Sequence, residues 1–483
     1  MPVKTYAPTK TPTSGQRHLM NRMGCGYSRT TFKQMRTAGS ASNWFEQQLD
    51  PKSVKESARA RALLTWFPDL RESPSTKWRK QEDGTKLAWS YAADLGSYSM
   101  MRRIYSRRQV LETMVDFWSN TLHVHAGADL AWVHRSSYDD LLRRHALGRF
   151  DDLLVEATLH PAMLLYLDSW RSTRRAPNEN HGRELLELHT VGRAAGYTEQ
   201  MVKDSARILS GYTVDAFASW QPFYSGSRHA TGPVTVLGFS AANSSRDGAE
   251  LARDYLRYLA RHPLTAQNIA RKLARYFVSD NPSAKLVGDL AKVFSSSGTD
   301  IKATLRALVA HPEFKAASGT LVRTPIEDFV ATCRVLQVDA KPPTSNASFA
   351  RAASWVPRTT LLYQWPRPDG APTGDAAWAS ASRMLSSFRM HWNLIGGWWP
   401  RAQVDYRSGR SWLPQRSLRF DEYVDHLCRM MLGKPSSLRI LSAAVAATGF
   451  PPKTRITQSH AVVTWLHVRL VGVLLDSPDH MRR

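Results

Sequence analysis

The chain has little cysteine and no long hydrophobic run. Among its 483 residues, the three cysteines are Cys25, Cys333 and Cys428. They lie far apart and form no C-x-x-C pair, so the sequence favours neither a disulfide framework nor a zinc ribbon, and we expect core packing. The longest apolar candidate, 461–475, is interrupted by His467 and Arg469 and falls short of the roughly 20 apolar residues that span a bilayer. The sequence therefore predicts no transmembrane segment.

Several common catalytic motifs are also missing. The chain contains no G-x-G-x-x-G after a strand, no G-x-x-x-x-G-K-[ST], no H-E-x-x-H and no G-x-S-x-G. Dinucleotide-binding, P-loop, zincin and α/β-hydrolase classes therefore lack support. What remains is chemistry carried by carboxylates and histidines.

Negative charge is scarce relative to positive charge. Lys plus Arg number 65 against 41 for Asp plus Glu, which gives a formal net charge of +24. An anionic polymer or surface is a physically reasonable partner: nucleic acid, anionic lipid headgroups or an acidic wall polymer. Because the positive residues are spread along the chain, a generic basic surface is the alternative.

Apolar residues recur at helical spacing along most of the chain from residue 43 onward. The pattern is interrupted by segments rich in Gly, Pro and aromatic residues at 220–242 and 363–370. The sequence therefore predicts a mainly α fold, a large multi-helix orthogonal bundle with long Gly/Pro/Trp-rich loops and at most short β-hairpins near residues 210–245.

Composition shifts suggest four parts. A disordered arm is expected at 1–16, a helical main domain at 17–340, a Pro/Gly/Trp-rich loop and helix segment at 341–410, and a C-terminal helical subdomain at 411–483. The first ten residues contain no apolar core of an export signal, so the sequence as it stands reads as cytoplasmic.

The densest run of ionisable and amide side chains is 177–192, which predicts a helix. Asn178 or Asn180 is a good N-cap, and Gly192 is a natural stop. At about 100° per residue, His181 and Glu184 fall on the apolar face. A buried carboxylate there must be paired, hydrogen-bonded, metal-bound or neutralised, so Glu184 is the first candidate functional residue.

Three motifs lie in and just after this segment: Asn178-Glu179-Asn180, Arg183-Glu184-Leu185-Leu186-Glu187-Leu188-His189-Thr190 and Gly196-Tyr197-Thr198. Together they resemble the signature of the bacterial domain-of-unknown-function 1800 family. Further matches lie at 18–22, 160–168, 271–273, 276–279 and 363–370, so the resemblance covers most of the chain from His18 onward. The resemblance implies membership of this family but no particular reaction, because the activity of the family is unassigned. Similar proteins often carry an export signal, which implies either that this member stays inside or that a leader is missing from this sequence.

One part of the family pattern is altered here. Where family members usually read Trp-His-Asn-His, this chain has Trp118-Ser119-Asn120-Thr121. His123 and His125 follow four residues after the missing histidines, one helical turn further along if the helix continues. They are the nearest substitutes for those histidines.

Two kinds of chemistry fit these residues. Acid–base catalysis would use Glu184, Glu187, His189 and Arg183. A metal site would use Glu184, Glu187, His123 and His125, and this mixture of carboxylate and imidazole suits iron, manganese or zinc better than magnesium.

The sequence also leaves other readings open. Glu184 or Glu187 could serve only structure, buried as an ion pair with an arginine of the run 102–108. The helix could instead bind a polar ligand without catalysis. A non-enzymatic hypothesis is that the chain is a basic helical module that binds an anionic polymer or a partner protein.

Overall fold

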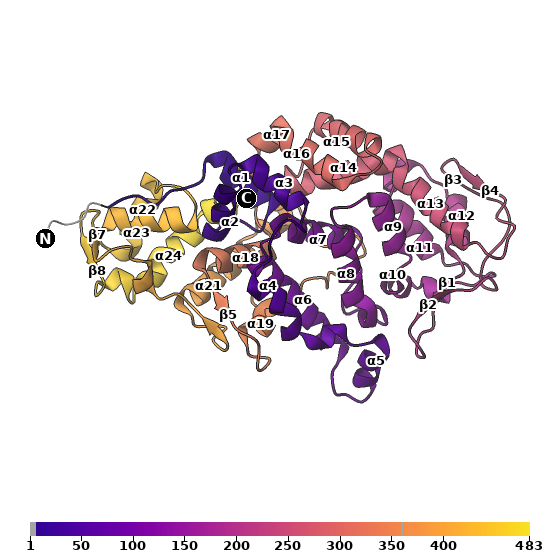
Figure 1. Cartoon of the computed structure of the whole chain (residues 1–483), viewed down its shortest axis with the longest axis horizontal. Coiled ribbons are helices and arrows are strands. Elements are labelled where there is room, and N and C mark those ends of the chain that lie inside the picture. Colours follow the sequence, from indigo (N-terminus) through magenta and orange to yellow (C-terminus); the bar gives the residue numbers. More distant parts are fainter. Residues whose placement is uncertain (1–5, 359–360) are drawn as a thin grey trace.

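The computed structural model describes residues 6–358 and 361–483, and helices make up 58% of it. The predicted mainly α fold is confirmed. Figure 1 shows an elongated molecule with the elements of residues 417–457 at one end and those of residues 199–261 at the other. The central part is formed by helices from the first 121 residues together with the helix Pro325–Leu336.

The N-terminal helices begin where the sequence offers a hydroxyl cap. Thr13, Ser28, Ser40, Ser57 and Ser73 each accept a hydrogen bond from a backbone N–H in the first turn of the helix that follows. The helices of this part are α1 (Ser14–Met23), α2 (Arg29–Thr37), α3 (Ala41–Leu49), α4 (Ala58–Trp66), α5 (Pro74–Glu82), α6 (Ala88–Tyr105) and α7 (Gln109–Thr121).

The expected disordered arm at 1–16 is wrong for its last three residues, because α1 begins at Ser14. Residues 1–5 of that arm lie outside the described residues. Tyr6 and Thr9 contact α22 near the other end of the chain, where the Thr9 hydroxyl lies 3.4 Å from His426 Nδ1.

The next part carries the central segment and ends in two hairpins. Its helices are α8 (Arg135–His145), α9 (Phe150–Thr158), α10 (Pro161–Tyr166), α11 (Glu179–Glu184) and α12 (Glu199–Leu209). The hairpins pair β1 (Tyr212–Val214) with β2 (Pro222–Tyr224) and β3 (Val234–Val236) with β4 (Phe239–Ala241), all antiparallel. Both hairpins lie where the sequence predicted them.

A third run of helices covers residues 249–336. It consists of α13 (Ala249–Arg261), α14 (Pro263–Phe277), α15 (Ala284–Ser296), α16 (Ile301–Ala310), α17 (Pro312–Ala316) and α18 (Pro325–Leu336). A His-Pro step joins α13 to α14 and another joins α16 to α17, and His262 and His311 accept a backbone N–H as caps at these steps.

The C-terminal part contains α19 (Phe349–Ala352), α20 (Asp375–Trp378), α21 (Ala381–Gly396), α22 (Phe420–Met431), α23 (Leu438–Thr448), α24 (His467–Leu475) and α25 (Pro478–Met481). Two small sheets join residues far apart in sequence: β5 (Asp339–Ala340) pairs with β6 (Val404–Asp405), and β7 (Ser417–Arg419) pairs with β8 (Arg455–Thr457). The sequence did not predict these two, because neither has a local turn.

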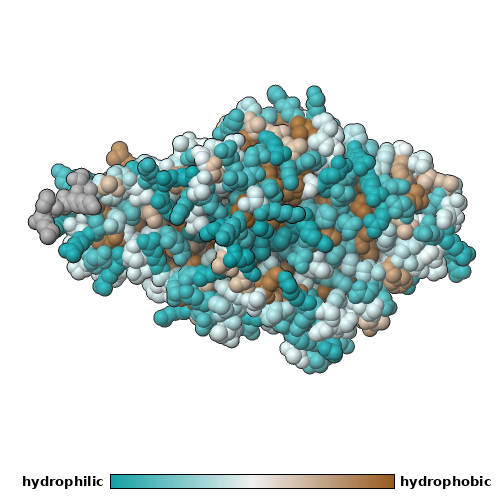
Figure 2. Space-filling view, in the orientation of Figure 1, coloured by the Kyte–Doolittle hydropathy of each residue, from teal (hydrophilic) through white to brown (hydrophobic). Residues whose placement is uncertain are grey.

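Buried apolar side chains from α1 to α24 form one cluster, which includes Cys333 and Cys428. The four-part division of the chain stays a prediction. Figure 2 shows mostly hydrophilic residues on the visible face, with hydrophobic ones scattered among them. Within the described ranges, no helix is both long and apolar enough to cross a membrane, as the sequence predicted.

Candidate functional site

The central segment is a helix that changes form halfway along. Asn178 caps α11 by accepting a hydrogen bond from His181 N at 3.2 Å. After Glu184 the backbone continues as a π-helix, Leu185–His189, rather than the regular α-helix that the sequence predicted. The wider turn rotates the residues after Glu184 away from their expected faces. Such π-helical turns occur frequently at functional sites.

Helix α14 stabilises this irregular ending. Asn268 Nδ2 donates to Thr190 O and Lys272 Nζ donates to Leu188 O, both at 2.7 Å. These two residues are four apart, so they lie on one face of α14 and satisfy backbone carbonyls that an ordinary helix end leaves unpaired.

Glu184 lies half-buried at the junction of α11 and the π-helix. Among the described residues, no hydrogen bond or ion pair reaches its carboxylate. Burial raises the pKa of Glu184, and the negative charges of Glu187 and Asp369 raise it further, against the opposing charges of Arg183 and Arg193. Glu184 therefore keeps its proton to a higher pH than an exposed glutamate does.

The other predicted catalytic residues have different surroundings. Arg193 lies 2.5 Å from Glu187 Oε1, and Tyr197 donates to Glu187 Oε2 at 3.2 Å. Arg183 points outward and holds Glu199 with both guanidinium NH2 groups. The catalytic assignment of Glu187 and Arg183 stays a prediction.

His189 is buried, and its Nδ1 has no hydrogen-bond partner in the described part of the chain. Burial lowers the pKa of His189 to about 3, helped by nearby His181, Lys272 and His123. His181 is fully buried and has both ring nitrogens unpartnered. The catalytic role of His189 stays a prediction.

The expected structural partners of Glu184 and Glu187 are wrong. The arginines of the run 102–108 bind other carboxylates. Arg102 donates hydrogen bonds to Glu112, and Arg103 forms an ion pair with Asp116 at 2.5 Å. Neither arginine reaches the central segment.

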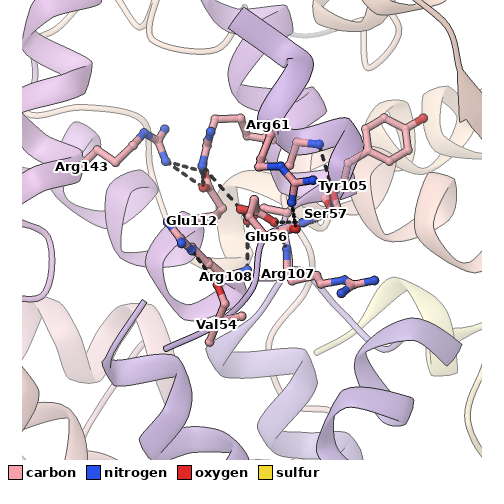
Figure 3. Close-up of polar contacts among 12 residues, drawn as sticks. Val54, Glu56, Ser57, Arg61, Tyr105, Arg107, Arg108, Glu112 and Arg143 are labelled. Carbon is pink, nitrogen blue, oxygen red and sulfur yellow. Dashed lines mark hydrogen bonds and ion pairs between the residues drawn. The ribbon is translucent and has the colours of Figure 1, made fainter. Parts of the chain in front are cut away.

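Figure 3 shows Glu112 with Arg143 and, beside them, Glu56 with Arg107 and Arg108. Glu112 Oε2 lies 2.7 Å from Arg143, and the Glu56 carboxylate accepts hydrogen bonds from Ser106 Oγ and Arg107 N, both at 2.7 Å. Burial alone would raise the pKa of Glu112, but Arg102 and Arg143 outweigh burial and lower it to about 2. This network is closed, because its buried carboxylates are paired.

The two histidines of the predicted metal set lie at the loop after α7. His123 is buried with its Nε2 3.0 Å from Trp365 O, and His125 accepts a hydrogen bond from Gly127 N at 3.0 Å. Across 6–358 and 361–483, the one group of three or more metal-ligating residues with ligand atoms within 4.8 Å of one another contains neither these histidines nor Glu184 and Glu187. The metal assignment of the four residues stays a prediction.

A pocket of about 650 Å³ lies between the end of α7, the end of α14 and the loop that follows Trp365. Its lining includes Asn120, Lys272, Arg275, Asp280, Arg367 and Asp369. A smaller cavity of about 90 Å³ adjoins it and is more apolar, with Tyr363, Trp365 and Trp378 in its wall. The pocket and the cavity share Asn120 of α7 and Trp365, Ala371, Pro372 and Thr373 of the loop that follows Tyr363, so this loop lies between them.

Asn120 fixes this loop. Its Nδ2 donates to Ala371 O at 2.9 Å, and its Oδ1 accepts from Ala371 N at 2.7 Å. A Cβ on Gly370 would meet the Asn120 carbonyl at 2.3 Å, and the φ of Gly370 is +77°, so glycine is required at this close approach. The residue Asn120, which the altered family pattern retains, thus builds the pocket wall.

Lys272 connects the pocket to the central segment, since it lines the pocket while its ammonium binds Leu188 O. Burial lowers the pKa of Lys272 to about 8, against a raising effect from Asp369. The carboxylate of Asp369 is held by Arg367. Sequence reasoning missed Lys272, Asn120 and Asp369 as functional residues, although all three lie in stretches that carry the family resemblance.

The fold and the pocket define a mainly helical protein in which a polar pocket lies where three separate stretches of family resemblance meet. The chain belongs to the family described as "Protein of unknown function (DUF1800)", whose model matches residues 18–482. No curated protein and no solved structure matches it.

Proposed function

We propose that the chain binds a polar ligand in the 650 Å³ pocket and transfers a proton to or from it. The supporting observation is that Lys272, with a pKa lowered to about 8, lines this pocket and also touches the central segment. An amine with that pKa changes charge near neutral pH, which is the property of a general acid or base.

Glu184 is the second acid–base group of the proposal. It neighbours Asp369 closely enough for that charge to raise its pKa, and it has no cationic partner in the part of the chain that the structure describes. A half-buried carboxyl group without an ion pair keeps its proton to a higher pH than a carboxyl group that is paired with a cation. In this proposal Glu187, His189 and Arg183 position the segment.

The lining also predicts what the ligand looks like. Three cations, Lys272, Arg275 and Arg367, face the pocket together with Asp280 and Asp369. The adjoining cavity adds an aromatic wall. A ligand with an anionic group, a hydrogen-bonding body and one apolar end matches this arrangement.

Thermal-shift measurements with defined probes test the proposal. Sugar acids, sugar phosphates, N-acylated amino acids and short acidic peptides are each added to the wild type, Lys272→Met and Arg271→Met. We expect at least one class to raise the melting temperature of the wild type and of Arg271→Met, but not of Lys272→Met. Arg271 is the matched control, because it is exposed, adjacent in sequence and absent from the pocket lining. Equal responses from the two variants would contradict the proposal.

The net charge of +24 supports a second function, binding of an anionic polymer without catalysis. This function predicts retention on heparin or nucleic acid that weakens steeply with salt and does not change in Lys272→Met. Retention that is insensitive to salt would exclude an electrostatic mechanism.

A further inference from the structure

Three residues from distant parts of the chain meet in the interior of the C-terminal half. Asp328 lies on α18, His391 on α21 and His480 on α25, and all three are buried. They form the group whose ligand atoms all lie within 4.8 Å of one another. None of them lines either pocket described above.

The distances within this group fit the edges of a metal coordination tetrahedron. Asp328 Oδ1 lies 3.2 Å from His391 Nε2 and 3.6 Å from His480 Nε2. Zinc–ligand bonds of about 2.0–2.1 Å at tetrahedral angles place neighbouring ligand atoms about 3.3 Å apart. The two separations can therefore be bridged with small shifts of the side chains.

The surroundings orient each ligand. Asp476 Oδ1 lies 2.7 Å from His391 Nδ1, the carboxylate–histidine arrangement that turns the opposite nitrogen toward a metal. Arg383 lies 3.3 Å from Asp328 Oδ2, which leaves Oδ1 for the ion. The Thr332 hydroxyl lies 2.8 Å from His480 Nε2, a contact that the ion replaces when this nitrogen becomes a ligand.

We propose that Asp328, His391 and His480 bind one divalent transition-metal ion of the zinc class. Two imidazoles and one carboxylate suit zinc, cobalt or iron(II) rather than magnesium or calcium, which prefer oxygen ligands. Because the ligands are buried and come from α18, α21 and the C-terminal helix, the ion joins these elements and has a structural role.

The same contacts allow a metal-free alternative. A protonated His391 lies between Asp328 and Asp476 and can serve as an internal cation that pairs with both. The two arrangements differ in composition, because only the proposed one contains a bound metal, so measurements of metal content separate them.

The experiment loads the ion as the protein folds. The full chain is produced in media supplemented with zinc or cobalt in turn, and metal content is measured by mass spectrometry after gel filtration. We expect one ion per chain, and with cobalt the intense visible absorption of a tetrahedral site. His480→Gln and His391→Gln should lose the ion, and Asp476→Asn should weaken binding by about 10–100-fold.

His467→Gln is the matched control, since His467 is also buried and lies on α24 but outside the group. Far-ultraviolet circular dichroism confirms that each variant remains folded. Wild-type protein without stoichiometric metal from either medium overturns the proposal and leaves the ion-pair alternative. Equal metal content in the His480→Gln and His467→Gln variants also overturns it.

Discussion

Glu112 and Glu184 are both glutamates on helices beside the apolar core, and their surroundings are opposite. Glu112 is buried between two arginines, and its pKa is lowered to about 2. Glu184 is half-buried, has no cationic partner among the described residues, and its pKa is raised. Two carboxylates in similar sequence settings thus carry opposite protonation preferences, because neighbours from distant segments decide the sign.

The difference separates a charge that holds the fold from one that remains available for chemistry. Removing Glu112 takes away the carboxylate that binds both Arg102 and Arg143, whereas removing Glu184 takes away a carboxyl group whose burial is offset by no ion pair among the described residues. The same contrast holds for cations, since Arg102 is paired with a carboxylate and Lys272 binds a backbone carbonyl.

The largest effect is expected from Glu112→Gln. The substitution removes the carboxylate charge that Arg102 and Arg143 share and leaves Arg143 with Asp139 at 3.2 Å and Arg102 with Glu56 at 3.9 Å. This loss should lower the free energy of unfolding by about 3 kcal/mol. Urea unfolding followed by circular dichroism measures the loss. Glu184→Gln is the matched comparison, and a similar loss in both variants would remove the distinction between the two sites.

Acid should remove the contribution of Glu112 to the free energy of unfolding. Because its folded pKa is lowered, its stabilisation is fully present above the ordinary value near 4.5 and is lost as pH falls toward about 2. The lost stability amounts to roughly 3 kcal/mol for this shift. Unfolding free energies measured between pH 2 and pH 5 should fall steeply in the wild type and more gently in Glu112→Gln. Parallel curves would show that other groups carry the acid sensitivity.

Lys272 should react as a neutral amine at unusually low pH. With a pKa lowered to about 8, its acylation rate should reach half of its maximum near pH 8, whereas an exposed lysine follows the ordinary value near 10.4. Peptide mass spectrometry after brief acylation compares Lys272 with the exposed Lys285. Identical pH profiles for the two lysines would argue against a tuned amine.

The smallest effect on stability is expected from Glu184→Gln. A raised folded pKa means that the folded protein keeps the Glu184 proton longer than the unfolded chain, so this group costs stability as pH rises above about 4.5. The variant should lack that cost, and its stability relative to the wild type should improve from pH 4 to pH 8. The opposite trend would indicate a hidden cationic partner for Glu184.

The comparison can be sharpened by changing a neighbour. Asp369→Asn removes one of the charges that raise the pKa of Glu184, so this pKa should fall in the variant. Carbon-13 nuclear magnetic resonance of labelled glutamate side chains measures the change. The pKa of Glu112 should stay constant in the same sample, because Asp369 does not contribute to it.

The sequence by itself determined the class of fold and the boundaries of many elements. Helical periodicity predicted a mainly α protein, and one of the two predicted caps of the central helix, Asn178, is its N-cap. The two hairpins at 212–241 lie in the region indicated by short β-branched stretches. These features depend on neighbours within a few residues, so local patterns contain the information.

Only the tertiary structure decided which charges are paired. The π-helix at Leu185–His189 depends on Asn268 and Lys272 reaching its carbonyls from α14, and no local pattern in 177–192 shows that contact. The meeting of Asp328, His391 and His480 likewise joins residues that are more than 60 positions apart from one another. Protonation, pairing and the geometry of the proposed metal site depend on distances of a few ångströms between such residues, and the fold sets those distances.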